Sequence, residues 1–169
     1  DLKTERLLKQ IQVGAAQGIA VDAAKNRYHV SVSREKKLVT FDREKLEIIS
    51  EVPLPGPGGA LTLGPSGVSR VYVGHIDATD LWVIDPDGKK IVSTLPLPTG
   101  PSRVIAENDT SLVYQAIKSD DTIVVMSAAD NNSTIGGAWP TAPAKKPHGL
   151  ALDVRNPRRL FVAGINGKL

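Results

Sequence analysis

A repeat of about 42 residues runs through the chain and constrains its fold more than any other feature. Each unit begins with a short alternating apolar stretch, and these stretches are 42, 43 and 46 residues apart. Their central residues are Ile19, Leu61, Val104 and Leu150. A helical repeat of this length would show apolar residues at a period of 3.6, whereas these stretches alternate at a period of two. The repeat therefore predicts units made of short β-strands.

The second unit shows the expected strands of a repeat most clearly. They are expected at 60–63, 71–73, 81–85 and 91–95. The turn at 85–88 reads Asp-Pro-Asp-Gly, in which Pro fixes φ and Gly accepts a positive φ. Four short strands per unit, punctuated by Gly and Pro, are typical of a propeller blade. We therefore predict an all-β fold, a β-propeller of four-stranded antiparallel blades, with about four blades' worth of sequence.

The repeat boundaries divide one propeller region, residues 1–169, into blades. Complete blades are expected at 15–56, 57–100 and 101–146. Residues 147–169 are expected to form an incomplete blade, and residues 1–14 an orphan fourth strand. The orphan strand is inferred because Asp1 aligns with Asp42 and Asp85, which come at the ends of third strands. The two chain ends thus complement each other within one blade. This favours a piece of a longer propeller over strand-swapped closure of a four-bladed ring.

The alternation also predicts which side chains are buried between the sheets. They are Ile19, Val21, Leu61, Leu63, Val104, Ala106, Leu150 and Leu152. Four aspartates recur at strand ends before turns, where a carboxylate can accept backbone N–H groups. They are Asp22, Asp42, Asp85 and Asp153.

Composition excludes several classes of function. The chain has no Cys, which rules out disulfides, thiolate metal sites and a Cys nucleophile in these residues. Its apolar runs are shorter than the roughly 18 residues of a membrane span, so no span is expected. Lys and Arg number 21 against 18 Asp and Glu, they are scattered, and there are only seven aromatic residues. Nucleic acid is therefore not expected as a partner.

Several phrases of the repeat resemble a known group of propellers. They are Tyr72–Gly74, Leu81–Asp85, Gly100–Pro101 and Pro147–Asp153, which are similar to YVTN-type and NHL-like repeats. The stretch 123–169 looks closest to bacterial YVTN proteins of the surface-layer or YncE-like type. The resemblance implies a seven-bladed propeller in an exported protein, periplasmic or secreted. Such propellers include binding proteins, streptogramin lyases and lactonases, so the resemblance leaves the function open.

In a propeller the first strand of each blade lines the central channel, and nearby loops surround its mouth. The candidate ligand-binding residues are Gln17, Ser102, Arg103 and His148 at the first strands, with His75, Asp77 and Lys118 between second and third strands. We predict that the first four point toward one axis. Arg103 stands where the other blades have small residues. It suits a carboxylate or phosphate ligand, or a bridge to an acid of a neighbouring blade.

His75 and His148 are the candidate catalytic residues, because imidazole can act as a general base or a metal ligand near neutral pH. They are 73 residues apart with no local metal-ligand spacing, so only the fold could bring them together. The alternative is that both are exposed loop histidines. His29 lies within a strand and is interpreted as a packing residue. No cofactor is predicted, and a divalent metal belongs only to the enzyme hypothesis.

Two functions from different classes remain. The first is a binding or scaffold protein that presents its central funnel and loop faces to a protein, a glycan or a small ligand. Its support is that the aligned positions hold no convergent acid–base or metal set. The second is a lyase or hydrolase, streptogramin-lyase-like or lactonase-like, with its site in the funnel. Self-association, or further blades that complete the propeller, is expected because isolated blade faces and edges would be exposed.

Overall fold

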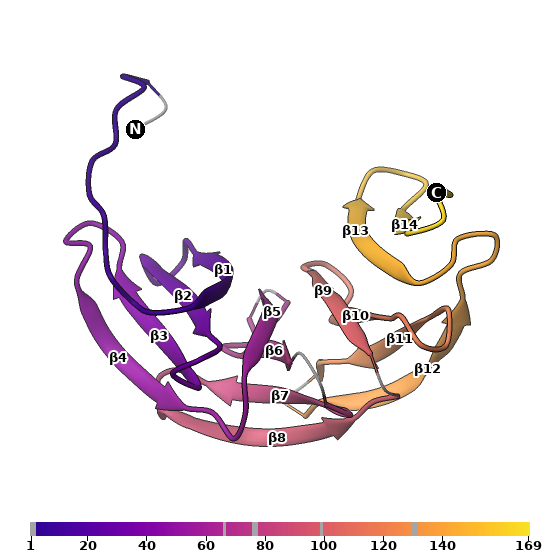
Figure 1. The fold of residues 1–169 in the computed structure, drawn as a ribbon, viewed down its shortest axis with the longest axis horizontal. Coiled ribbons are helices and arrows are strands. Elements are labelled where there is room, and N and C mark those ends of the chain that lie inside the picture. The colour runs from indigo at the N-terminus through magenta and orange to yellow at the C-terminus, as the bar shows by residue number, and fades with distance from the viewer. Residues whose placement is uncertain (1–2, 66, 76–77, 99, 130–131) are drawn as a thin grey trace.

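The structure is a computed structural model that describes residues 3–65, 67–75, 78–98, 100–129 and 132–169. Over these residues the chain forms three four-stranded antiparallel sheets and a two-stranded sheet, arranged in an arc (Figure 1). The prediction of an all-β propeller fold is confirmed. Within the same residues no helix is long and apolar enough to cross a membrane.

Each four-stranded sheet pairs its strands in chain order, as a blade requires. The first blade contains β1 (Ala16–Asp22), β2 (Arg27–Val32), β3 (Lys37–Asp42) and β4 (Ile48–Pro53). The second contains β5 (Gly58–Leu63), β6 (Val71–His75), β7 (Asp80–Asp85) and β8 (Lys90–Pro96). The third contains β9 (Pro101–Glu107), β10 (Leu112–Ile117), β11 (Thr122–Ser127) and β12 (Thr134–Pro140). The last sheet pairs β13 (Pro147–Asp153) with β14 (Arg159–Gly164).

The first strands β1, β5, β9 and β13 lie on the inner side of the arc, and β4, β8 and β12 lie on the outer side (Figure 1). β5 contacts β1 and β9, and β9 also contacts β13. This is the axial position that the sequence analysis gave to the first strand. The N- and C-terminal ends lie on opposite sides of the opening (Figure 1). Strand-swapped closure is not formed over the described residues, because β14 pairs with β13 alone.

Apolar side chains fill the spaces between successive sheets, and their burial holds the blades together. The first and second sheets meet through Leu38, Val52, Leu54, Leu61, Val71, Val73, Trp82 and Ile84. The second and third meet through Tyr72, Leu81, Val83, Leu95, Leu97, Val104, Val113, Ile117, Val124, Met126 and Ala128. The last sheet packs Leu150, Leu152, Leu160 and Val162 onto Tyr114, Ala116, Ile123 and Val125.

The predicted core is correct at Leu61 and Val104, which are 8% and 4% exposed. Four further predicted positions are partly buried against a neighbouring sheet, namely Leu63, Ala106, Leu150 and Leu152. The prediction is wrong for Ile19 and Val21, which are 67% and 51% exposed. Both side chains leave β1 on the face that points away from the second sheet, where no described sheet packs.

The predicted turn aspartates are confirmed. Backbone N–H groups two or three residues further along donate to the carboxylate in each case. The donors are Lys25 to Asp22, Glu44 and Lys45 to Asp42, Asp87 and Gly88 to Asp85, and Arg155 to Asp153. The positive φ of the turn after β7, expected at Gly88, falls instead at Lys89, with a φ of 52°. The aspartate carboxylate is therefore the turn feature that recurs in the repeat.

Candidate functional site

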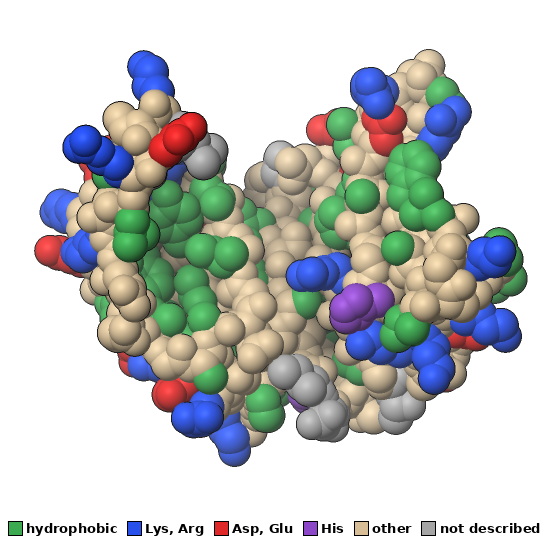
Figure 2. Space-filling model, turned by 45° about the horizontal axis from the view of Figure 1, so that its top comes forward, with side chains coloured by type: hydrophobic (Ala, Val, Ile, Leu, Met, Phe, Trp, Pro, Cys, Tyr) green, Lys and Arg blue, Asp and Glu red, His purple; other side chains and the backbone are tan. Residues whose placement is uncertain are grey.

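A hollow of about 660 Å³ opens beside the first sheet, on its open face. Its apolar lining comprises Ile11, Val13, Ala16, Gly18, Ile19, Tyr28, Val30, Phe41 and Leu46, and its polar lining comprises Lys9, Gln17 and Arg103. Figure 2 shows the hydrophobic side chains gathered inside this depression, on the left of the view. Among the described residues no carboxylate lines the hollow.

A β-bulge interrupts the first strand of every blade near its start. In β1, Ala16 pairs with Val32 and Gly18 with Ser31, which leaves Gln17 as the extra residue. In β13, His148 is extra in the same way. The corresponding bulges contain Gly59 and Ala60 in β5, and Ser102 and Arg103 in β9. Bulges re-aim side chains and are common beside functional sites.

All four predicted first-strand residues lie in these bulges, namely Gln17, Ser102, Arg103 and His148. The structure brings Gln17 and Arg103 to the same hollow. The Ser102 hydroxyl instead donates to the Pro147 carbonyl at 2.7 Å, which ties β9 to β13. His148 is exposed and its ring makes no hydrogen bond with the described residues.

Arg103 carries an exposed cation on a fixed backbone. Its carbonyl accepts a hydrogen bond from the buried Gln115 side-chain amide at 3.1 Å. Its guanidinium makes no ion pair or hydrogen bond with any described residue. The bridge to a neighbouring acid, one of the two roles expected for Arg103, is therefore not formed in the described part of the chain. The guanidinium donors therefore face solvent and none is used within the described residues.

His75 lies in a different environment from His148. It ends β6, its Nε2 contacts the Asp80 carboxylate, and its ring stacks on Trp82 with centroids 4.0 Å apart and planes at 12°. The side chain is buried and does not line the hollow. No hydrogen bond, ion pair or ring contact joins the two candidate catalytic histidines. Across the described ranges no three His, Cys, Asp or Glu side chains gather where they could hold a metal.

The remaining predicted residues lie outside the hollow. Lys118 directly follows β10, and its backbone N–H donates to the Gly100 carbonyl at 2.8 Å. It is partly buried and does not line the hollow. Asp77 lies outside the described residues.

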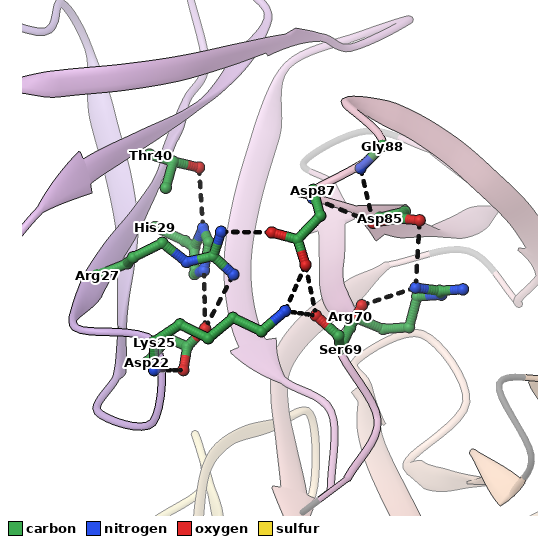
Figure 3. Close-up of polar contacts among 10 residues, drawn as sticks. All are labelled: Asp22, Lys25, Arg27, His29, Thr40, Ser69, Arg70, Asp85, Asp87 and Gly88. Carbon is green, nitrogen blue, oxygen red and sulfur yellow. Dashed lines mark hydrogen bonds and ion pairs between the residues drawn. The ribbon is translucent and has the colours of Figure 1, made fainter.

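A polar network joins the first two blades at the far ends of β1 and β7 (Figure 3). Asp87 accepts hydrogen bonds from Lys25, from Arg27 at 2.6 Å and from Ser69 at 3.1 Å. These donors, Lys25 first, hold the pKa of Asp87 well below its usual range. Arg27 also pairs with Asp22 at 3.2 Å. Acids partner these cations, and the Lys25 and Arg27 pairs with Asp87 link the first blade to the second.

His29 is a buried member of this network that sequence analysis interpreted only as a packing residue. Its side chain is 0% exposed, and its Nδ1 lies 3.0 Å from the Thr40 hydroxyl. Its Nε2 lies 3.8 Å from Asp22. Burial, followed by the charge of Arg27, lowers the pKa of His29 to about 4. The imidazole is therefore neutral near pH 7.

No family model and no curated protein matches the chain. Several solved structures share its fold. Hydrazine synthase of Kuenenia stuttgartiensis has a TM-score of 0.72 and 14% identity, covering 96% of this chain and 49% of that one. A functionally unknown protein from Desulfotomaculum acetoxidans DSM 771 has a TM-score of 0.76 and 14% identity, covering 93% and 59%. A chain of the mitotic checkpoint complex has a TM-score of 0.75 and 12% identity, covering 90% and 47%.

These likenesses show the fold alone, because identities of 12% to 14% do not establish a shared site. The chain spans between 47% and 59% of the length of these similar structures.

Proposed function

We propose that this protein is a non-catalytic binding module whose hollow beside the first sheet binds a ligand with an anionic group on an apolar body. The observation that carries the proposal is the unpaired Arg103 guanidinium beside an apolar wall that contains no described carboxylate. Gln17 lines the same hollow and offers an amide donor. Arginine suits this role because its planar fork can donate two parallel hydrogen bonds to a carboxylate, sulfonate or phosphate.

The hollow has the size and lining of a small-molecule site. Its volume of about 660 Å³ lies within the range of ligand pockets, and most of its lining is apolar. Apolar walls contribute affinity through burial, while one cation orients the ligand and selects its charge. Lys9 adds a second positive charge to the lining.

The comparisons support a binding role in general terms. One similar chain belongs to a mitotic checkpoint complex, so a chain of this fold takes part in a protein assembly there. The resemblance to exported YVTN-type propellers belongs to the same proposal, and it implies a ligand met outside the cytoplasm. No described group of residues favours the lyase or hydrolase alternative over binding.

Replacing Arg103 with Met should weaken binding of 8-anilinonaphthalene-1-sulfonate by about tenfold. This dye joins a sulfonate to an aromatic body and fluoresces on apolar protein surfaces. Met keeps most of the apolar stem of Arg103 and removes its charge and its donors. Fluorescence titration of both proteins at fixed ionic strength measures the change in Kd.

Two controls separate recognition of the sulfonate charge from non-specific hydrophobic binding. N-phenyl-1-naphthylamine lacks the sulfonate and should bind the R103M variant and the parent protein alike. Arg159→Met removes an exposed cation that does not line the hollow and should leave the affinity for the sulfonate unchanged. Equal sulfonate affinity in the parent and the R103M variant would refute the proposed function.

A further inference from the structure

Three loops at one end of the third and fourth sheets carry lysines that are scattered in the sequence. These loops, called the lysine loops below, are 118–121, 141–146 and 165–168. The pairing of β11 with β10 and β12, and of β13 with β14, makes all three leave the sheets at the same end. The lysines are Lys118, Lys145, Lys146 and Lys168. The fold therefore gathers four cations that the sequence separates.

Hydrogen bonds tie the lysine loops to one another. The Lys146 N–H donates to the Asp121 carboxylate at 2.6 Å, which joins the second loop to the first. The Ile165 N–H donates to the Lys145 carbonyl at 2.9 Å, and the Lys145 N–H donates to the Asn166 side-chain oxygen at 2.9 Å. These bonds join the third loop to the second. The lysines are therefore presented from a backbone that is held in place.

The lysine side chains have few acidic partners. Lys145 approaches the Asp121 carboxylate at 3.7 Å, and its side chain is 72% exposed. Within the described residues the side chains of Lys118, Lys146 and Lys168 make no ion pair or hydrogen bond. The lysine loops hold two acids against four lysines. They therefore present an excess of positive charge to solvent.

Cations at the other end of the same two sheets are paired. Arg158 contacts Glu107 at 2.8 Å and Asp109 at 3.3 Å. Arg155 contacts Asp153 at 2.8 Å. Pairing of this kind neutralises the other end, so the lysine loops are set apart by the charge that they leave without a partner.

An exposed histidine and an exposed isoleucine share the end that carries the lysine loops. Figure 2 shows Lys and Arg side chains around an exposed histidine, right of centre. This histidine is His148, because His29 and His75 are buried. Ile165 lies in the third lysine loop and is 63% exposed. An apolar side chain beside cations suits a surface in which anionic groups cover an apolar interior.

The composition of the lysine loops indicates the kind of partner. Lysine is a hydrated point charge on a flexible stem, whereas bidentate recognition of a single anion favours arginine. The four lysines occupy separate loops and none of them lines the hollow, so a partner that meets them all carries many negative charges. The loops contain no aromatic residue on which bases could stack, which disfavours single-stranded nucleic acid. Exposed Ile165 favours a membrane over a soluble polyanion.

We infer that the lysine loops dock this protein on a membrane surface that contains anionic phospholipids. The lysines lie among the headgroups, and Ile165 reaches the boundary between headgroups and acyl chains. This docking goes beyond the proposed function, and it uses no residue that lines the hollow.

Co-sedimentation with vesicles tests the inference. The parent protein should sediment with vesicles made of equal parts of phosphatidylcholine and phosphatidylglycerol, and not with vesicles of phosphatidylcholine alone. The double substitution K145Q/K146Q should weaken binding to the mixed vesicles by at least about tenfold, because each cation near an anionic surface adds to the affinity. Binding should also weaken as the salt concentration is raised, because salt screens exposed charges.

The matched control is K89Q/K90Q, which removes the same charge from the turn between β7 and β8 at the other end of the second sheet. Both lysines are exposed, and Lys89 has a φ of 52° where Lys146 has 49°. This variant should bind the mixed vesicles as the parent protein does. Ile165→Ser should bind them at least about threefold more weakly, since it removes the apolar contact and keeps the lysines.

Four results would overturn the inference, with urea unfolding confirming that each variant is folded. They are no sedimentation of the parent with the mixed vesicles, equal sedimentation with vesicles of phosphatidylcholine alone, equal binding by K145Q/K146Q and K89Q/K90Q, and equal binding by I165S and the parent. Retention on heparin without sedimentation with vesicles would assign the lysine loops to a soluble acidic polysaccharide instead. None of these results bears on anion binding in the hollow, which is measured with the dye and Arg103→Met.

Discussion

Leu61→Ala should lower the free energy of unfolding by about 2–4 kcal/mol, whereas Ile19→Ala should lower it by less than about 1 kcal/mol. The two residues hold the same position in successive blades, but Leu61 is 8% exposed and Ile19 is 67% exposed. Truncating Leu61 leaves a cavity between packed sheets, while truncating Ile19 removes contacts that are mostly with solvent. Urea unfolding followed by tryptophan fluorescence measures both changes.

The comparison also reports whether the open face is covered in solution. Equal costs for the two substitutions would show that a partner surface, including a second copy of the chain, buries Ile19. Repeating the measurement over a tenfold range of protein concentration distinguishes a second copy, because its effect depends on concentration.

His29 should make stability fall as the pH is lowered from about 6.5 to 4. Its pKa is lowered to about 4 in the folded protein, against an ordinary value of 6.5. As the pH falls, the unfolded chain therefore takes up the proton before the folded protein does. The contribution of neutral His29 to stability is fully present above pH 6.5 and is lost between pH 6.5 and 4. The difference between the folded and the ordinary pKa of His29 corresponds to about 3 kcal/mol in the free energy of unfolding.

The matched variant is His29→Gln, which keeps a polar side chain beside Thr40 and removes the titrating group. The variant is expected to lose about 3 kcal/mol less stability than the parent between pH 6.5 and 4. Chemical denaturation at several pH values measures this difference. The charged groups that act on His29 are Arg27, Asp22 and Asp87, and all three are present in both proteins. Parallel pH curves for the two proteins would show that His29 is not the cause.

Sequence reasoning predicted most of the fold because strand alternation and turn chemistry are local properties that recur in every unit. The aspartate turns and the axial first strands followed from these signals. The exposure of Ile19 did not follow from them, because the residues around Ile19 alternate in the same way as those around Leu61. What differs is the presence of a sheet on the other side, which no local pattern records.

The candidate site was predicted only in part. Gln17 and Arg103 do share one hollow, but the bulges that place them depend on the pairing of two strands. Sequence analysis placed His75 and Asp77 between the same two strands and did not single out Asp80, whose carboxylate contacts His75 in the structure. A signal was available, because continuing the pairing of Val73 with Trp82 along the hairpin places Asp80 opposite His75.

An NMR titration tests anion binding in the hollow most directly. Addition of 8-anilinonaphthalene-1-sulfonate should shift the guanidinium Nε–H signal of Arg103 and the side-chain amide of Gln17, because both line the hollow. The Arg103 signal is assigned by its loss in the R103M variant, and Arg159 provides a reference outside the hollow. Saturable shifts at Arg103 and Gln17, with Arg159 unchanged, are the predicted result. Saturable shifts at other sites that leave Arg103 and Gln17 unchanged would contradict it.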